Sequence, residues 1–461
     1  MWFLLVLAGC RDPGNPASDD TGRGDASTLA EQLGCDSDLS VFGELMVEQT
    51  EVTSVKRLIW NSTEPIRPRV VTDIGRETHI EGSILDQEST QGEVLLLGVP
   101  YQRSSTSILV AETEEGVACS SPHIGQIHSL DPTIPEITLS HWDPDSASGG
   151  FTVTGLITDE SSMVVILDEQ GEYVWSKEAG LGVVSRAAFA RDQSTLLYMT
   201  WAEHVHEPGT IYRLSYDGSL VDEVKLTGAH TDFIELPDGG MAAIGWDLRD
   251  IQDAEGRTDR VLGDTIVEID SQGNERVVWS VFDSYIPDLG LDYDRASIGM
   301  DEDLLDWSHG NGLDYDEEED DYLISLFGLG SVLRIDRQTG QVLWTLSDTH
   351  GDFENSTGEP LVQGAHSVEV LAPDRILIFN RNIPNPLDDM EDIGETCSEA
   401  VELALDSSEG QVEKVWSYGS EDCVLVVYFG EAIRLQNDHT LTIFSSSGQI
   451  SEASPDGETV W

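Results

Sequence analysis

A chain of 461 residues is too long for one ordinary hydrophobic core, so it predicts two or three domains or one repeat architecture. Its 87 acidic residues, against 24 Lys and Arg, give a net charge of −63 that repels phosphate backbones and anionic lipid headgroups. Nucleic acid is therefore excluded as a partner, and we interpret the acidity as a solvated surface.

The first ten residues, MWFLLVLAGC, form a short apolar run ending in Leu7-Ala8-Gly9-Cys10. This resembles a bacterial lipoprotein signal, which implies cleavage before Cys10 and attachment of lipid to its sulfur. Residues 1–9 are then a signal peptide and residues 10–40 a flexible tether rich in Gly, Asp, Ser and Pro. The alternative is a frayed apolar N-terminus, because the run has no basic start. We expect a protein of the bacterial cell envelope that reaches the membrane through its lipid anchor only.

Four further cysteines are even in number and suit two disulfides in an oxidising compartment. Three pairings are possible. We favour Cys35–Cys119 with Cys397–Cys423, because each of these bonds closes a local unit. A zinc or redox site built on cysteine is disfavoured, since the chain has no Cys-x-x-Cys.

Residues 41–135 contain short apolar runs at turn-marked intervals, such as VKRLIWNST, RPRVVTDIG and STSILVAET. Such runs are typical of a small β-sandwich. The run around Trp60 and the later LLLGVPY loosely resemble a fibronectin type III module. We expect this domain to act as a spacer.

Residues 136–461 repeat one pattern, a strand ending in Asp, a Gly turn and a strand ending in Trp. Copies include VVILDEQGEYVW, TIVEIDSQGNERVVW and VLRIDRQTGQVLW, and each follows another strand pair. Four strands per unit and six units predict a six-bladed β-propeller, so the chain is expected to be all-β.

Three histidines recur at one place in these units. His230 and His366 each stand seven residues before a Pro-Asp turn, Pro237-Asp238 and Pro373-Asp374, and His309 stands seven residues before Asp316 in its own hairpin. In a propeller the first strand of each blade lines the channel, so the three side chains are expected to converge near the axis. Arg186 is expected near the same level, and Arg434 with less support.

A ring of His and Arg inside an acidic protein favours a small anion, and imidazole adds nucleophilic and acid–base capacity. Transfer of a sulfuryl or phosphoryl group is the chemistry that this pattern predicts. A transition-metal centre held by three histidines is the competing use of the same residues.

The segments DWSHGNGLDYDEEEDDYLISL, GAHTDFIELPDGG and GAHSVEVL resemble the bacterial arylsulfate sulfotransferases over most of residues 150–461. The resemblance implies a six-bladed propeller that moves a sulfuryl group from an aryl sulfate to a phenol through a sulfated histidine. It implies no cofactor and no nucleotide sulfate donor. It also implies His366 as the nucleophile, His309 and Asn311 as contacts of the sulfuryl oxygens, and His230 as the residue that completes the pocket and protonates the leaving phenol.

One residue departs from that family. Where its members carry Ser-x-Arg after the His-x-Asn hairpin, this chain has Ser325-Leu326-Phe327. Loss of such a charge commonly costs about a hundredfold or more in rate. Arg381 or Arg186 is expected to replace it if activity is kept. The rival interpretation is a catalytically silent surface propeller that binds an anionic or aromatic ligand or a protein.

The acidic run from Asp314 to Asp321 is a second candidate for an ion. Calcium binding there is the less favoured interpretation, because the run lacks the Gly and terminal Glu spacing of an EF-hand. A solvated turn is the favoured one.

Overall fold

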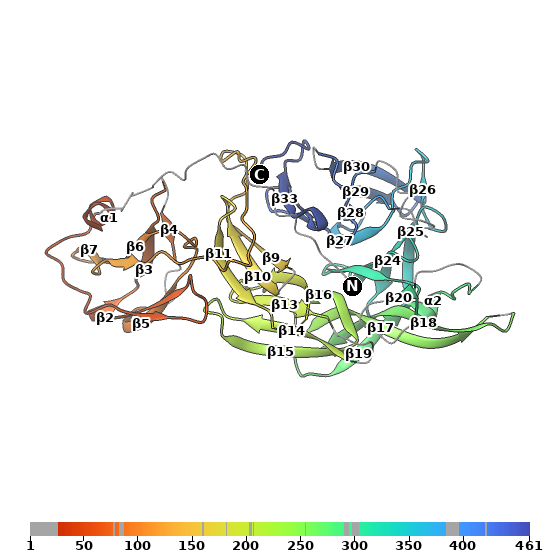
Figure 1. Cartoon of the computed structure of the whole chain (residues 1–461), viewed down its shortest axis with the longest axis horizontal. Coiled ribbons are helices and arrows are strands. Elements are labelled where there is room, and N and C mark those ends of the chain that lie inside the picture. Colours follow the sequence, from red (N-terminus) through yellow and green to blue (C-terminus); the bar gives the residue numbers. More distant parts are fainter. Residues whose placement is uncertain are drawn as a thin grey trace.

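The computed structural model describes residues 26–76, 79–82, 87–158, 161–180, 182–201, 205, 207–253, 255–289, 295–296, 304–383, 396–419 and 422–461. Cys10 and the expected signal peptide lie outside these residues. The described chain is nearly all strand, and Figure 1 shows a ring of sheets with a smaller β-domain beside it. Within the described residues no helix is both long and apolar enough to cross a membrane.

The smaller domain is a β-sandwich. One sheet has the order β1 (Met46–Gln49), β2 (Lys56–Ile66), β5 (Ser89–Leu96). The other has the order β4 (Ile80–Glu81), β3 (Arg69–Asp73), β6 (Ser105–Thr113), β7 (Gly116–Cys119), with β8 (His123–Gly125) also paired to β6. Leu58 and Trp60 of the first sheet pack with Val70 and Leu109 of the second in one buried cluster. The alternation of buried and exposed residues in β2 reflects this one-sided packing.

The sandwich begins earlier than the sequence predicted. Helix α1 (Ala26–Gln32) lies within the stretch that we expected to be tether, and Leu29 is only 1% exposed. Leu29 packs with Val71, Ile108 and Val110, and Cys35 is bonded to Cys119 of β7 with a Cα–Cα distance of 5.7 Å. Residues 26–40 therefore belong to the packed domain. The likeness of this domain to fibronectin type III stays a prediction.

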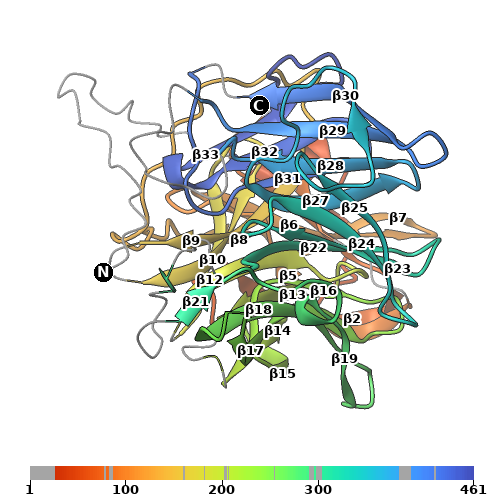
Figure 2. The ribbon, with the colours of Figure 1, turned by 90° about the vertical axis from the view of Figure 1, so that its right-hand side faces the viewer.

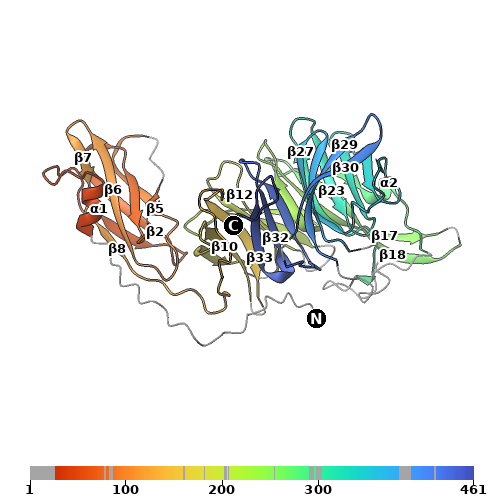
Figure 3. The same cartoon turned by 90° about the horizontal axis from the view of Figure 1, so that it is seen from above.

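The sandwich is held against the first two blades of the ring (Figure 3). Val52 and Val55 join a buried cluster with Val164 and Trp175. Arginines of the sandwich pair with carboxylates of the blades: Arg57 with Asp217, Arg76 with Asp168 and Glu172, and Arg103 with Glu172. The domain is thus docked through both apolar and ionic contacts.

Six sheets form the ring, which confirms the predicted six-bladed propeller. Their pairing is antiparallel apart from the added strands β21 (Leu304–Asp306) and β26 (Glu354–Asn355), each of which joins its blade by parallel pairing. Blade 1 is β9 (Phe151–Ile157), β10 (Ser162–Asp168) and β11 (Tyr173–Glu178). Blade 2 is β12 (Val184–Phe189), β13 (Leu196–Thr200), β14 (Pro208–Leu214) and β15 (Leu220–Thr227). Blade 3 is β16 (Ala229–Glu235), β17 (Met241–Gln252), β18 (Thr258–Ile269) and β19 (Glu275–Ser280), with α2 (Val281–Ser284) following and β20 (Arg295–Ala296) and β21 (Leu304–Asp306) at its edge.

The remaining blades complete the circle. Blade 4 is β22 (Gly310–Asp316), β23 (Asp321–Leu326), β24 (Ser331–Asp336) and β25 (Val342–Ser347). Blade 5 is β27 (Ala365–Ala372), β28 (Arg375–Asn380), β29 (Glu399–Asp406) and β30 (Gln411–Gly419), with β26 (Glu354–Asn355) beside β30. Blade 6 is β31 (Glu431–Arg434), β32 (Thr440–Phe444) and β33 (Gln449–Ala453), with the 3-10 turn η2 (Ser445–Ser447) between the last two. Figure 2 shows the strands of blades 4 and 5 side by side.

Blade 6 meets blade 1 through a few specific contacts, and in Figure 1 the blue end of the chain lies beside yellow β11. The Trp461 indole donates to the Glu169 carbonyl at 2.7 Å, and the Asp143 amide donates to the Val460 carbonyl at 2.9 Å. The Ser148 hydroxyl donates to Glu452 at 2.6 Å. Hydrogen bonds from blade 1 and from the segment before β9 therefore close the ring.

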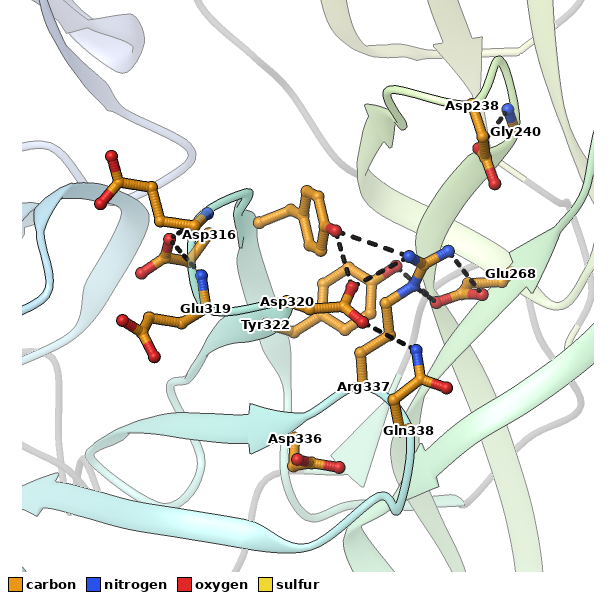
Figure 4. A network of polar contacts seen from close by, with 12 residues as sticks. Asp238, Gly240, Glu268, Asp316, Glu319, Asp320, Tyr322, Asp336, Arg337 and Gln338 are labelled. Atoms are coloured by element: carbon orange, nitrogen blue, oxygen red, sulfur yellow. Dashed lines mark hydrogen bonds and ion pairs between the residues drawn. The ribbon is translucent and has the colours of Figure 1, made fainter.

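Ion pairs join the middle blades, as Figure 4 shows for blades 3 and 4. Arg337 reaches Glu268 at 2.7 Å and Asp320 at 3.0 Å, and the Tyr322 hydroxyl donates to Glu268 at 2.6 Å. Nearby, Arg334 pairs with Asp316 at 2.6 Å and with Asp321 at 2.9 Å. Glu317 also pairs with Arg191, so four carboxylates of the run considered for calcium bind arginines, which favours a structural role for that run.

Candidate active site

The first strand of each blade lies innermost, and four of these strands have a register irregularity near their beginning. The residues skipped by the pairing are Ser185 in β12, Thr231 and Asp232 in β16, Asn311 in β22, and His366 and Ser367 in β27. All six of them line one cavity. Bulges leave residues unpaired and re-aim their side chains, so this irregularity turns side chains of four blades toward the same space.

His366 lies at the bulge of β27 and is 8% exposed. Burial, the positive charge of Arg381 and the neighbouring His309 together hold the pKa of His366 well below its usual value, although a backbone hydrogen bond with Gly430 opposes them. The ring of Phe429 lies 5.7 Å from the imidazole. His366 is therefore a neutral imidazole near pH 7, the form in which a ring nitrogen can attack an electrophile.

His309 precedes β22 and has φ 49°, a left-handed conformation that is uncommon for a residue with a side chain. Its Nδ1 lies 2.6 Å from the Asp306 carboxylate, and its side chain is 36% exposed. Burial disfavours the imidazolium, but the charge and hydrogen bond of Asp306 outweigh this effect and raise the pKa of His309 above its usual value. His309 thus favours the protonated form, the opposite of His366.

Arg381 follows β28, and its positive charge acts on both His309 and His366. Its side chain donates to the carbonyls of Gly364 at 3.0 Å and Val427 at 2.9 Å, while Nη2 is buried with no hydrogen-bond partner in the structure. No ion pair with a described carboxylate is present. Burial without a counter-ion lowers the pKa of Arg381 to about 10, so it stays charged at neutral pH. A buried, uncompensated guanidinium attracts an anion.

Phe327 lies between these groups. Its ring is 5.5 Å from that of His309, and the Arg381 guanidinium lies 4.4 Å from its centroid. Its amide donates to the His309 carbonyl at 2.9 Å. Gly364, at φ 73°, lies where a Cβ would come within 3.4 Å of both Phe327 and Arg381. The residue in place of the expected arginine therefore supports another arginine by a cation–π contact.

His230 is placed differently from the other two histidines. It is 4% exposed, stacks on Trp246, and has both ring nitrogens in hydrogen bonds, to Thr231 at 2.8 Å and to Asp264 at 3.0 Å. No ring nitrogen is left for a shared metal ion, which disfavours the three-histidine metal centre. The predicted role of His230 in completing the pocket stays a prediction.

The spacing rule aligned His309 with His230 and His366, but the strands align differently. His230 and His366 are the second residues of β16 and β27, and the second residue of β22 is Asn311. Asn311 lines the cavity, and its Nδ2 is buried without a hydrogen-bond partner among the described residues. An amide donor is thus available beside His366 for an oxygen of a ligand.

Arg186 and Arg434 are both compensated by carboxylates. Arg186 lines the cavity and pairs with Asp232 at 2.5 Å and Glu431 at 3.4 Å. Arg434 pairs with Glu402 at 2.7 Å. Neither has the free charge of Arg381, and Arg434 is not part of the cavity wall among the described residues.

Four residues that sequence reasoning missed organise this site. Asp264 accepts hydrogen bonds from His230, Ser308 and the Gly310 amide. Asp306 sets the charge of His309, and its place three residues before His309 in DWSH was a usable signal. The Phe429-Gly430 pair had no such signal, because it reaches His366 from another blade.

A family model for arylsulfotransferases (ASST) matches residues 138–456. The search of curated proteins finds no match. Among solved structures, the β-propeller domain of Cps50 (Swd1) from Myceliophteria thermophila has a TM-score of 0.36 and 10% identity, over 67% of this chain and 84% of that chain. An auxiliary nutrient binding protein from Bacteroides ovatus has a TM-score of 0.35 and 10% identity, over 90% and 85%. The gluconolactonase XC5397 from Xanthomonas campestris has a TM-score of 0.33 and 13% identity, over 61% and 75%.

These structural neighbours are distant and differ in function from one another, so they do not bear on activity. The family match does bear on activity, because it spans all six blades and includes His309, His366, Asn311 and Arg381. The chain belongs to the arylsulfotransferase family.

Proposed function

We propose that this protein transfers a sulfuryl group from an aryl sulfate to a phenol, with His366 as the group that carries the sulfuryl between them. The observation that supports this most is that two histidines near one cation favour opposite protonation states, and that this cation has no carboxylate partner among the described residues. His366 is held neutral, His309 favours its protonated form, and Arg381 is charged and unpaired. Two titratable groups whose pKa values are pushed apart define an acid and a nucleophile.

In the first half-reaction, the free ring nitrogen of His366 attacks the sulfur of the aryl sulfate. The nitrogen–sulfur bond forms as the bond between sulfur and the aryl oxygen breaks, and the departing phenolate takes a proton from His309. Arg381 and the Nδ2 of Asn311 are the donors for the sulfuryl oxygens. His309 is left neutral.

In the second half-reaction, a phenol gives its proton to His309 as its oxygen attacks the sulfur. The nitrogen–sulfur bond breaks, the new ester leaves, and both histidines regain their first states. No redox step or nucleotide is needed. His309 therefore serves as the acid in the first half-reaction and as the base in the second, while His366 is the nucleophile in the first and the leaving group in the second.

Arg381 supports catalysis over the silent-propeller alternative. Loss of the family arginine at Phe327 would leave an anion without a counter-charge, but Arg381 lies 4.4 Å from that very ring. We propose that the positive charge has been relocated from one blade to the next.

The test is turnover of a chromogenic aryl sulfate with and without phenol, together with intact mass measurement of a donor-only sample. We expect phenol-dependent turnover and a mass increase of about 80 Da on His366, the mass of one sulfuryl group. His366→Ala should lower turnover by about a thousandfold or more and abolish the adduct. Ser185→Ala, on another bulge of the same cavity, is the matched control for folding. Unchanged turnover in His366→Ala would overturn the assignment.

We also propose that the protein is lipid-anchored through Cys10 in the bacterial cell envelope. The Leu-Ala-Gly-Cys box and two disulfides suited to an oxidising compartment support this. Cys10→Ala should move the protein from the membrane fraction to the supernatant. An unchanged distribution would contradict the anchor.

A further inference from the structure

The cavity that ends at His366 is far larger than one phenol ring requires. Its volume is about 700 Å³, and it runs between blade 1 and blade 6 to the segment 135–141 outside the ring. Pockets of this order hold ligands of drug size rather than single rings. From its position and lining we infer that it binds the body of an extended, uncharged phenol, whose hydroxyl reaches the sulfuryl group on His366. This inference rests on the proposed function.

The walls of the cavity are mainly apolar along its length. Blade 1 contributes Leu156, Val165 and Tyr173, and blade 6 contributes Ile443 and Ile450. Phe429 stands at the inner end, with its ring 5.7 Å from that of His366. An aromatic ring beside the nucleophile is a surface on which a phenol ring can stack.

The charges on the walls exclude a second anionic group. Among the described residues, Arg186 is the only Lys or Arg in the lining, and it is already paired with Asp232 and Glu431. Two more acidic residues, Glu136 and Asp422, line the cavity together with His141. The free positive charge lies instead at Arg381, which is not part of this wall among the described residues. A ligand can therefore place an anion only at the inner end.

The site thus has two approaches with different chemistry. His309 is open to solvent with 36% of its side chain exposed and lies with Arg381 on the anion-binding side. The cavity reaches His366 and Asn311 from between the blades and suits an apolar group. The sulfuryl group is held where these approaches meet, and the phenol body extends along the seam between blades 1 and 6.

The experiment compares three ligands by calorimetry with the full protein and no donor: phenol, 4-phenylphenol, and 4′-hydroxybiphenyl-4-carboxylate. We expect 4-phenylphenol to bind about tenfold tighter than phenol, because its second ring is buried in the apolar part. The carboxylate should lose this gain, because its charge would face Glu136 and Asp422. Equal affinity for phenol and 4-phenylphenol, or full retention by the carboxylate, would overturn the inference without any variant.

Variants then locate the binding. Ile443→Trp and Leu156→Trp fill the cavity from facing blades, and each should remove the tenfold gain for 4-phenylphenol while leaving phenol binding within about twofold. Leu343→Trp, at a residue of blade 4 that is 50% exposed and outside the cavity, is the matched control. An unchanged gain in both folded cavity variants would refute the placement. If the binding pattern holds but no phenol accepts a sulfuryl group, the proposed function fails and the ligand site stands.

Discussion

Two regions along the propeller axis have opposite chemistry although they share the same inner strands. At one, His309 and His366 surround Arg381, whose guanidinium has no carboxylate partner among the described residues. At the other, Arg186 pairs with Asp232 and Glu431 and lies near Asp314, and a further buried acid, Glu369, lies near Asp314 and Glu431. Arg186 is the more compensated cation, with burial opposed by Asp232 and Glu431.

The carboxylate region owes its form to the joining of blades. Asp232 accepts from the Leu313 amide at 2.8 Å, Asp314 from the Val370 amide at 2.7 Å, and Glu369 from the Arg434 amide at 2.7 Å. Each acid of one inner strand thus binds the backbone of the next. The comparison shows that an acidic protein builds an anion site by leaving one buried cation unpaired, rather than by accumulating cations.

Removing the unpaired charge tests this comparison most severely. Arg381→Met should lower kcat about a hundredfold, because the sulfuryl oxygens lose their charged donor. Arg434→Met should change kcat by less than about threefold, because Glu402 already neutralises Arg434. Steady-state assays with a chromogenic donor measure both.

A double variant sharpens that result. If charge rather than packing is what Arg381 supplies, Phe327→Arg in the Arg381→Met background should recover about tenfold of the loss. Equal losses in Arg381→Met and Arg434→Met, or no recovery, would argue that the two regions do not differ as described.

The two disulfides also differ in where they lie relative to the candidate active site. Cys397–Cys423 anchors the loop that supplies Val427 to Arg381 and Gly430 to His366, whereas Cys35–Cys119 lies in the sandwich. Cys397→Ser with Cys423→Ser should lower kcat about tenfold by loosening these contacts. Cys35→Ser with Cys119→Ser should leave kcat within about twofold but lower stability by about 4 kcal/mol, because the bond closes a separation of 84 residues. Thermal unfolding and steady-state assays separate the two effects, and a larger kcat loss in the sandwich variant would contradict this assignment.

The sequence predicted most of the frame and only part of the site. The repeated Asp-Gly-Trp pattern predicted six blades, and the favoured cysteine pairing is the one found. The bulges at His366 and Asn311 depend on strand register, which residue spacing does not reveal. The spacing therefore aligns His309 with His366, although the residue at the equivalent strand position is Asn311, two residues later. The contact of Arg381 with Phe327 joins two blades, so the sequence alone could not predict how close these two side chains lie.

The pKa of His309 can be changed without substituting the histidine itself. Asp306 raises the pKa of His309, so the protonated form persists above the usual range and is lost as pH rises through that raised value. Asp306→Asn removes the charge, and the alkaline limb of the kcat/KM profile should move to lower pH. At the alkaline edge of the wild-type profile we expect a loss of a few fold, about threefold to tenfold, and little change below pH 6. An alkaline limb that does not move would show that His309 is not the acid.

The smallest expected effect lies at the carboxylate region, and it concerns stability rather than turnover. Burial first, and the nearby Asp314 and Glu431, raise the pKa of Glu369 to about 8, against 4.5 for an ordinary Glu. The folded protein therefore binds a proton that the unfolded chain releases between these two values, so this stabilising contribution is complete below about 4.5 and is lost as pH rises through about 8. Glu369→Gln keeps an oxygen for the Arg434 amide but removes the titration, so the fall of Tm with rising pH should become shallower, while kcat stays within about twofold. Melting curves from pH 5 to 9 test this, and an unchanged slope would mean that the carboxylate region does not hold that proton.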